Sequence, residues 1–129
     1  INAVRLKGQI NENGKMLAYN NDLPELNHNE IVGWQNNPEI FKHLCVLWLE
    51  DDNDNNRTRI RKNITEKILN EINISQFSIK VNGESFQERF LNMIHYGDWL
   101  SFWCAILHKT DPSPVEKIVR LKNELSKKK

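Results

Sequence analysis

The clearest pattern of hydrophobic and polar positions in this chain covers Arg57–Ile72. Apolar residues recur there at helical spacing and would form one stripe: Ile60, Ile64, Ile68, Leu69 and Ile72. Ser85 and Glu88 resemble a capping box in front of a second stripe, and Gly97 suits a left-handed helix end. Val115–Leu125 has the same periodicity. The pattern therefore predicts three amphipathic helices.

Alternating positions predict strands elsewhere. Ala3–Lys7 and Lys15–Tyr19 flank Asn13-Gly14, the dipeptide most typical of a tight hairpin, so an N-terminal β-hairpin is expected. Cys45–Leu49 is a short apolar run that fits a buried strand or a helix end. Phe77–Val81 alternates like a strand.

Two short helices are predicted between these strands. Asn27 and Glu30 have the spacing of a capping box, and Asn37-Pro38 places an N-cap residue before a proline. The chain is therefore expected to be an α+β protein. We predict a single small domain over residues 1–129, with an N-terminal β-hairpin, a few further strands and about four helices.

The segment His95–His108 is the most hydrophobic part of the chain and is rich in aromatic residues. So much aromatic surface is expected to be buried, with Trp103 in the core. Asp98–Lys109 fits a central strand, apolar on both faces, and it also fits a helical stripe. Its aromatic content favours the strand.

The composition excludes some classes of function but does not identify one. The net charge is +1, which gives no general attraction to nucleic acid or to an anionic membrane. No apolar run approaches the roughly 20 residues needed to span a bilayer. The sequence opens at Ile1 without a methionine, as expected of a domain excised from a longer chain. Cys45 and Cys104 lie in apolar runs and are expected to be buried free thiols rather than a disulfide.

No motif of catalysis or cofactor binding is complete. The glycines are scattered, so no phosphate-binding loop can form. The acidic loop after Glu50 lacks the glycine and the glutamate of a calcium loop, and His28-x-Glu30 lacks the cysteines of a zinc deaminase. Cys104 and His108 are one helical turn apart, but a packed thiol is favoured over a nucleophile. No cofactor or metal is predicted.

Two surfaces could bind a macromolecule. A protein partner would be bound by the predicted hairpin and the segment after it, through Val4, Arg5, Lys7, Tyr19, Leu23, Leu26 and Trp34. The alternative is a nucleic-acid-binding helix start formed by Arg57, Arg59, Arg61 and Lys62, although nearby acidic residues favour internal ion pairing of this cluster. A small hydrolase or nuclease using scattered His and Asp residues is a third hypothesis.

From Val4-Arg-Leu-Lys-Gly-Gln-Ile to Val119-Arg-Leu-Lys, the chain resembles the origin-recognition-complex-interacting region of the first silent information regulator protein of budding yeast. This resemblance implies a nuclear, non-enzymatic adaptor in transcriptional silencing and heterochromatin. Its partner would be the bromo-adjacent homology domain of the largest origin-recognition-complex subunit, together with other silencing proteins. Direct DNA contact is not expected of such an adaptor.

Overall fold

A computed structural model describes residues 2–128 of the chain. Its elements in chain order are α1 (Asn2–Glu12), the 3₁₀-helix η1 (Glu25–Asn27), α2 (Glu30–Gly33), α3 (Pro38–Phe41), β1 (Cys45–Glu50), α4 (Asn56–Glu71), β2 (Ser75–Lys80), α5 (Phe86–Leu107) and α6 (Glu116–Lys127). The predicted α+β class is confirmed. The chain forms two compact units, one of residues 20–93 and the other of residues 1–19 and 94–129, and α5 contributes to both.

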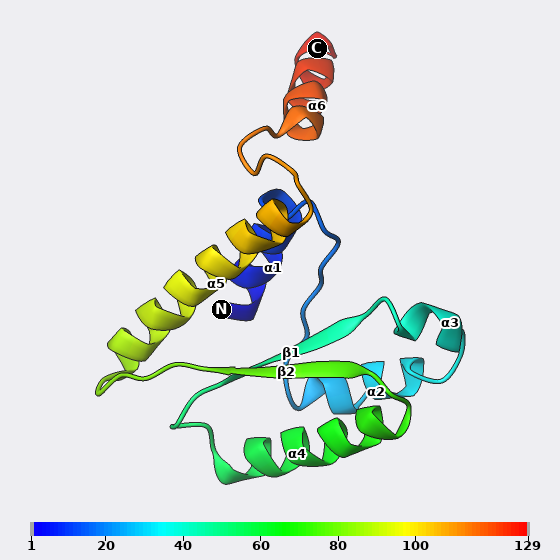
Figure 1. Ribbon diagram of the computed structural model, residues 1–129, viewed down its shortest axis with the longest axis vertical. Helices are drawn as coiled ribbons and strands as arrows, with labels where there is room; N and C mark the ends of the chain where they lie inside the picture. The colour runs from blue at the N-terminus through cyan, green and yellow to red at the C-terminus, as the bar shows by residue number, and fades with distance from the viewer. Residues whose placement is uncertain (1, 129) are drawn as a thin grey trace. The chain divides into compact units, whose positions relative to one another are not determined.

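In the unit of residues 20–93, β1 and β2 form a parallel two-stranded sheet. Cys45 pairs with Ser75 at one end, and Glu50 pairs with Lys80 at the other. Because the strands are parallel, the chain must cross over between them, and α4 makes that crossover alongside both strands (Figure 1). The ends of β1 and β2 that lead onward along the chain therefore lie at the same side of this unit.

The core of this unit lies between the sheet, α4 and η1. Its buried residues are Leu26, Trp48, Leu69 and Ile74, with Leu23, Trp34, Phe41, Val46 and Ile72 packed around them. Trp48 donates its indole N–H to Gln76 Oε1 at 3.0 Å, so the buried ring leaves no unpaired donor. Gln76 in turn donates to the carbonyl of Glu66 at 3.0 Å and thereby ties β2 to α4.

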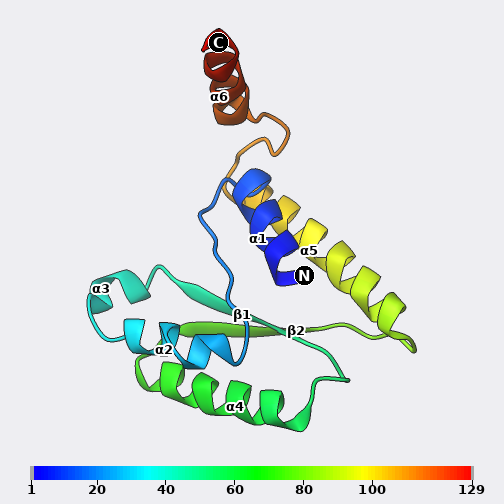
Figure 2. The same ribbon diagram turned by 180° about the vertical axis from the view of Figure 1, so that it is seen from behind.

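In the other unit, α1 lies along the second half of α5 (Figure 2). Gly97 makes this close approach possible, because a Cβ atom there would lie 3.1 Å from Leu6 Cδ1. Arg5 forms an ion pair with Asp98 at 2.9 Å, and Gln9 donates to the same carboxylate at 2.7 Å. These contacts fix the register between the two helices.

The predicted N-terminal hairpin is wrong, because residues 2–12 form the helix α1. Its Arg, Leu, Lys and Gln residues all have good helix propensity, and this outweighs the short alternation. Asn13-Gly14 ends the helix instead of turning a hairpin. The N–H groups of both residues point to the carbonyl of Gln9, at 2.8 and 3.4 Å. Lys15 then adopts a left-handed conformation with φ of 53°.

The prediction of a strand over Asp98–Lys109 is also wrong, since this segment is the second half of α5. Gly97 lies inside the helix and does not end it. The aromatic residues occupy one side of α5, where Trp103 is 53% exposed and not in the core. Strand propensity reflects packing on a pleated surface and yields to context. The context here is a long helix that needs a small-residue face at Gly97, Ser101 and Ala105, all buried.

The remaining elements follow the predictions more closely. The helix predicted over Arg57–Ile72 is α4, capped by Asn55, whose side chain accepts from Thr58 N at 2.9 Å. Only Leu69 of its predicted apolar stripe is buried, while Ile60, Ile64 and Ile68 are exposed. Both cysteines are free as expected, but Cys45 is exposed and Cys104 half-buried.

Candidate functional site

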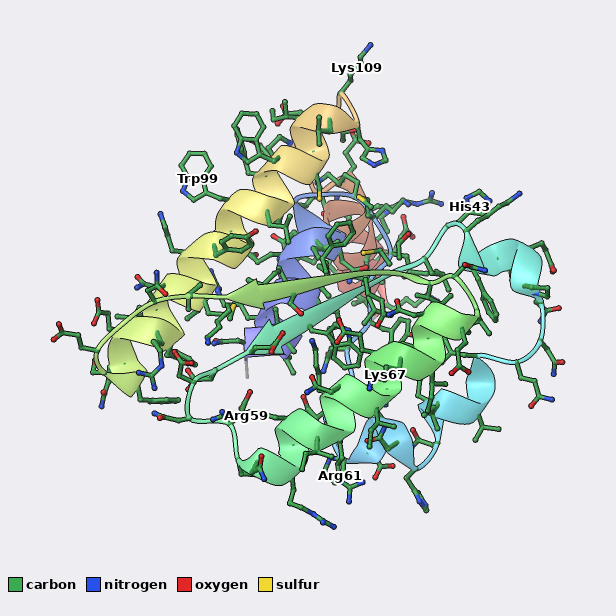
Figure 3. The ribbon with its side chains drawn as sticks, turned by 60° about the horizontal axis from the view of Figure 1, so that its bottom comes forward. His43, Arg59, Arg61, Lys67, Trp99 and Lys109 are labelled. Atoms are coloured by element: carbon green, nitrogen blue, oxygen red, sulfur yellow. The ribbon has the colours of Figure 1, made fainter. Side chains whose placement is uncertain are left out.

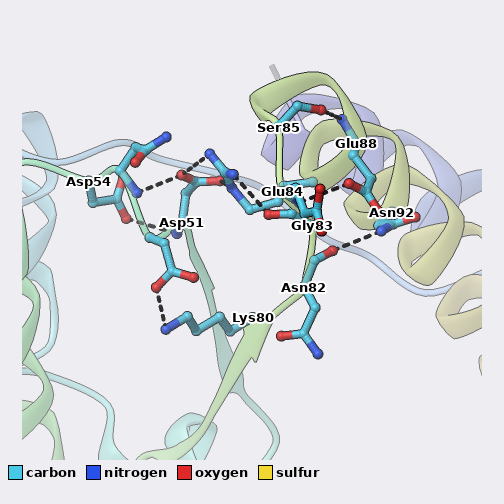
Figure 4. A network of polar contacts seen from close by, with 12 residues as sticks. Asp51, Asp54, Lys80, Asn82, Gly83, Glu84, Ser85, Glu88 and Asn92 are labelled. Atoms are coloured by element: carbon cyan, nitrogen blue, oxygen red, sulfur yellow. Dashed lines mark hydrogen bonds and ion pairs between the residues drawn. The ribbon is translucent and has the colours of Figure 1, made fainter.

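A network of polar contacts joins the chain just after β1 to the start of α5 (Figure 4). Arg89 is buried and donates two hydrogen bonds to the Asp51 carboxylate, from Nε at 2.8 Å and from Nη2 at 3.2 Å. Its remaining Nη1 donates to the carbonyl of Gly83 at 3.1 Å. The hydrogen bonds from Arg89 hold the pKa of Asp51 below its ordinary value. No local sequence pattern indicates this pair, because its members are 38 residues apart.

The charged residues around this network are paired as well. Lys80 forms an ion pair with Asp52 at 2.6 Å, and Lys62 lies between Glu66 at 2.9 Å and Glu50 at 3.2 Å. Lys62 and Lys80 are therefore each paired with a carboxylate, as Arg89 is. Such a network braces the loops that follow the two strands.

The basic cluster at the start of α4 is divided by the fold. Lys62 is half-buried beneath its carboxylates, with its ammonium 5.9 Å from the centre of the Trp48 ring. Arg59 donates to the carbonyls of Asp52 and Asp54 at 2.6 and 2.9 Å. Arg57 and Arg61 are exposed, and Figure 3 shows Arg59 and Arg61 extending from different sides of α4. The four cations thus do not form one continuous surface.

The second polar cluster is the turn from Asn27 to Glu30, between η1 and α2. Asn27 donates to the hydroxyl of Thr65 at 2.6 Å, and that hydroxyl donates to the carbonyl of Arg61 at 2.8 Å. Thr65 is only 1% exposed, so the turn is anchored to the interior of α4. Asn29 accepts from Glu30 N at 2.6 Å and caps α2. The side chains on both sides of His28 are therefore fixed.

His28 itself is exposed on this anchored turn. The Asn27 Oδ1 atom beside it is buried and has no hydrogen-bond partner among the described residues. A buried acceptor without a donor is uncommon and calls for an explanation. Asn21 donates to Glu30 at 3.0 Å, so a carboxylate is also held nearby. The turn therefore presents an imidazole, amide groups and a carboxylate from one anchored segment.

The surroundings of the other histidines are less suited to holding an imidazole in a fixed position for proton exchange. His95 accepts the indole N–H of Trp99 at 3.1 Å, so one of its ring nitrogens is occupied. His43 precedes β1 and His108 follows α5, and both are exposed (Figure 3 labels His43). Histidine is the side chain that most readily exchanges a proton near neutral pH. His28 is the histidine whose neighbours are best ordered for such a role.

The predicted partner-binding residues differ widely in exposure. On α1, Val4 is exposed, Arg5 pairs with Asp98, and Lys7 is half-buried. Tyr19 is 64% exposed in the segment that follows α1.

The other three predicted partner-binding residues are largely enclosed. Leu26 belongs to the buried core, Leu23 packs against that core, and Trp34 does so while its ring lies 5.5 Å from the ring of Phe41. Leu26 is therefore a core residue and not a surface anchor.

The described range, residues 2–128, lacks two further features. No group of three or more His, Cys, Asp or Glu side chains in this range is arranged to hold a metal ion. No helix in the same range combines the length and the apolar character needed to cross a bilayer.

The chain is similar to part of several longer proteins that are named as isomerases. The family model described as bacterial phospho-glucose isomerase C-terminal SIS domain matches residues 1–125. A bifunctional phosphoglucose/phosphomannose isomerase of Aquifex aeolicus is 43% identical over 97% of this chain and 39% of its own length. Enzymes of the same name from Caldicellulosiruptor bescii and Thermoplasma volcanium are 40% and 35% identical, over 96% of this chain and 37% and 39% of their own lengths. The chain thus spans about two fifths of each relative.

These matches overturn the resemblance to a silencing protein. That likeness depended on length, composition and a supposed opening hairpin, and the hairpin is a helix. The predictions of a non-enzymatic adaptor, of partners in the origin recognition complex and of a role in heterochromatin are therefore wrong, as the relatives are named isomerases. The nuclear location loses its basis with the resemblance. The chain belongs to the family of bacterial phosphoglucose isomerase C-terminal SIS domains.

Proposed function

We propose that this chain is the C-terminal part of an enzyme that isomerises phosphorylated aldohexoses, with glucose and mannose phosphates as substrates. The observation that carries the proposal is the 43% identity to a bifunctional phosphoglucose/phosphomannose isomerase over 97% of the chain. Since the chain spans 39% of that relative, the activity is proposed for the longer protein to which this part contributes.

The chemistry of such a reaction defines what the chain must supply. Moving a carbonyl group from one carbon of a sugar to the next requires that a proton leave the carbon beside the carbonyl and that a proton reach the neighbouring position. Side chains that exchange protons near neutral pH accelerate this step. Sugar hydroxyls also need hydrogen-bond acceptors and donors held in fixed positions.

The turn from Asn27 to Glu30 supports a contribution to that chemistry. His28 is exposed, while Asn27 is anchored to Thr65 at 2.6 Å and Asn29 caps α2. An imidazole on an anchored turn is held close to one position, which proton transfer requires. We assign His28 as the candidate proton-transfer group of this part of the enzyme.

The test uses the full-length protein and the matched variants His28→Asn and His43→Asn. Unaltered protein is expected to convert both glucose 6-phosphate and mannose 6-phosphate to fructose 6-phosphate. His28→Asn should lower kcat by about 10²–10⁴-fold, the usual contribution of a positioned acid or base. His43→Asn, an equally exposed histidine outside the turn, should retain activity. Absence of turnover in the unaltered protein contradicts the proposed function, and equal losses in both variants contradict the role of His28.

A further inference from the structure

The second half of α5 carries an exposed apolar surface, here called the aromatic stripe. It consists of Trp99, Phe102, Trp103, Ile106 and Leu107, which are 51%, 37%, 53%, 43% and 79% exposed. The rings form a continuous patch, because Trp99 and Phe102 meet edge to face at 5.7 Å and Phe102 and Trp103 do so at 5.8 Å. The indole N–H of Trp99 is satisfied by His95, so the patch presents no unpaired donor at that ring.

The stripe is not the surface that α5 uses to hold α1. The face toward α1 is made of small and polar residues, with Gly97 against Leu6, Asp98 paired with Arg5 and Ser101 accepting from Asn13 at 3.1 Å. In Figure 3, Trp99 extends from α5 on the side away from α1. One face of α5 therefore packs against α1, and the opposite face carries the exposed aromatic stripe.

The exposed part of the stripe is large for the surface of a protein that acts alone. Large apolar side chains bury about 150–250 Å² each, so these five expose on the order of 500 Å². Contiguous apolar patches beyond a few hundred Å² generally mark an interface.

The relatives indicate what covers the stripe. They are more than twice as long as this chain, which covers 37–39% of them, and the family is a C-terminal domain. The remaining polypeptide would enter at α1, which packs through Arg5 and Asp98 on the face of α5 opposite the stripe. Because it is covalently attached to α1, this polypeptide has a high effective concentration at the surfaces around α5.

We propose that the aromatic stripe of α5 is the surface against which the preceding part of the longer chain packs. This inference rests on the proposed function. The occupant is the polypeptide that precedes α1 in the same molecule. It would present an apolar surface to Trp99 and Trp103, and the two parts of the enzyme would fold against each other through this contact.

Hydroxyl-radical footprinting of the full-length protein with mass spectrometry tests this proposal. The chain supplies its own references, because Trp48 is 7% exposed and Leu17 is 97% exposed. If the stripe is covered, labelling of Trp99 and Trp103 falls to the level of Trp48. If both tryptophans are labelled as half-exposed residues while Leu17 is fully labelled, the proposal is overturned.

Light scattering of the same samples identifies the occupant. Protection of both tryptophans in a monomeric protein supports the preceding part of the chain. Protection that disappears when an oligomer is diluted to monomers assigns the stripe to a second copy and overturns our choice of occupant.

A pair of substitutions gives an independent readout. Trp103→Ser should increase the rate at which a protease cleaves the full-length protein just before α1, whereas Ile64→Ser, a 54% exposed residue of α4, should not. Equal rates in the unaltered protein and Trp103→Ser count against docking. Because neither footprinting nor proteolysis depends on turnover, an active enzyme with a labelled stripe refutes only the docking. An inactive enzyme with a protected stripe refutes only the proposed function.

Discussion

Replacing Thr65 by valine should loosen the turn that carries His28. The substitution keeps the shape of the side chain and removes its hydroxyl, which accepts from Asn27 at 2.6 Å and donates to the carbonyl of Arg61 at 2.8 Å. Thr65 is 1% exposed, so water does not readily replace the lost group. The amide of Asn27 would then have neither its donor nor its Oδ1 satisfied.

The size of the effect follows from these two losses. A net hydrogen bond is worth about 1 kcal/mol, and leaving a buried donor unpaired costs about 1–3 kcal/mol, so Thr65→Val should lower the free energy of unfolding by about 2 kcal/mol. Asn27→Ala should cost less, under about 1 kcal/mol, since the hydroxyl of Thr65 still donates to Arg61 and an unsatisfied oxygen is removed. In the double variant the two losses should not add, because valine then faces no polar partner.

Urea denaturation followed by circular dichroism measures these differences. With a slope of about 2 kcal/mol/M, a loss of 2 kcal/mol lowers the midpoint by about 1 M. Thr58→Val is the matched control on the same helix. Only the backbone N–H of Thr58 is used in its cap, so a change within about 0.5 kcal/mol is expected. Equal midpoints for Thr65→Val and the unaltered chain, or fully additive losses in the double variant, would refute the reasoning.

Two further outcomes are expected. Leu69→Ala, which removes three carbons from a residue 1% exposed, should lower the free energy of unfolding by about 2–5 kcal/mol, whereas Ile64→Ala at 54% exposure should cost under about 1 kcal/mol, both measured by urea denaturation. The hydrogen bonds from Gln9 and Arg5 hold the pKa of Asp98 below its ordinary value. The resulting stability is present above the unfolded pKa, about 3.9, and is lost as pH falls through the folded value. An NMR titration in which Gln9→Ala does not raise the pKa of Asp98 would contradict this.

Local sequence signals predicted the helix and strands of residues 20–93 well, because several independent signals indicate the same element there. The helix over Arg57–Ile72 was predicted from its apolar period and its length, and the structure adds an N-cap at Asn55. Cys45–Leu49 and Phe77–Val81 are short and apolar or alternating, and both are strands in the structure within two residues at each end. What the local pattern could not provide is the parallel pairing of β1 with β2, which depends on the crossover.

The wrong predictions concern segments whose sequence signal is typical of two different structures. Asn13-Gly14 is typical of a hairpin and also of a helix end, and only the long-range contacts of α1 with α5 decide between them. The stretch Trp99–Leu107 has the composition of a buried strand, but it forms part of α5 and its aromatic residues are exposed. The sequence pattern offers His28 only as part of an incomplete zinc-deaminase motif. The anchoring of Asn27 to Thr65, which supports the role proposed for His28, joins residues 38 positions apart.

The parallel pair of strands has a consequence for handling this polypeptide by itself. Within residues 2–128, β1 and β2 each bond to one neighbour, so each strand keeps an outer edge of backbone N–H and C=O groups that no other strand covers. Open edges of this kind recruit further strands from other molecules. At high concentration the 129-residue chain is therefore expected to self-associate through these edges.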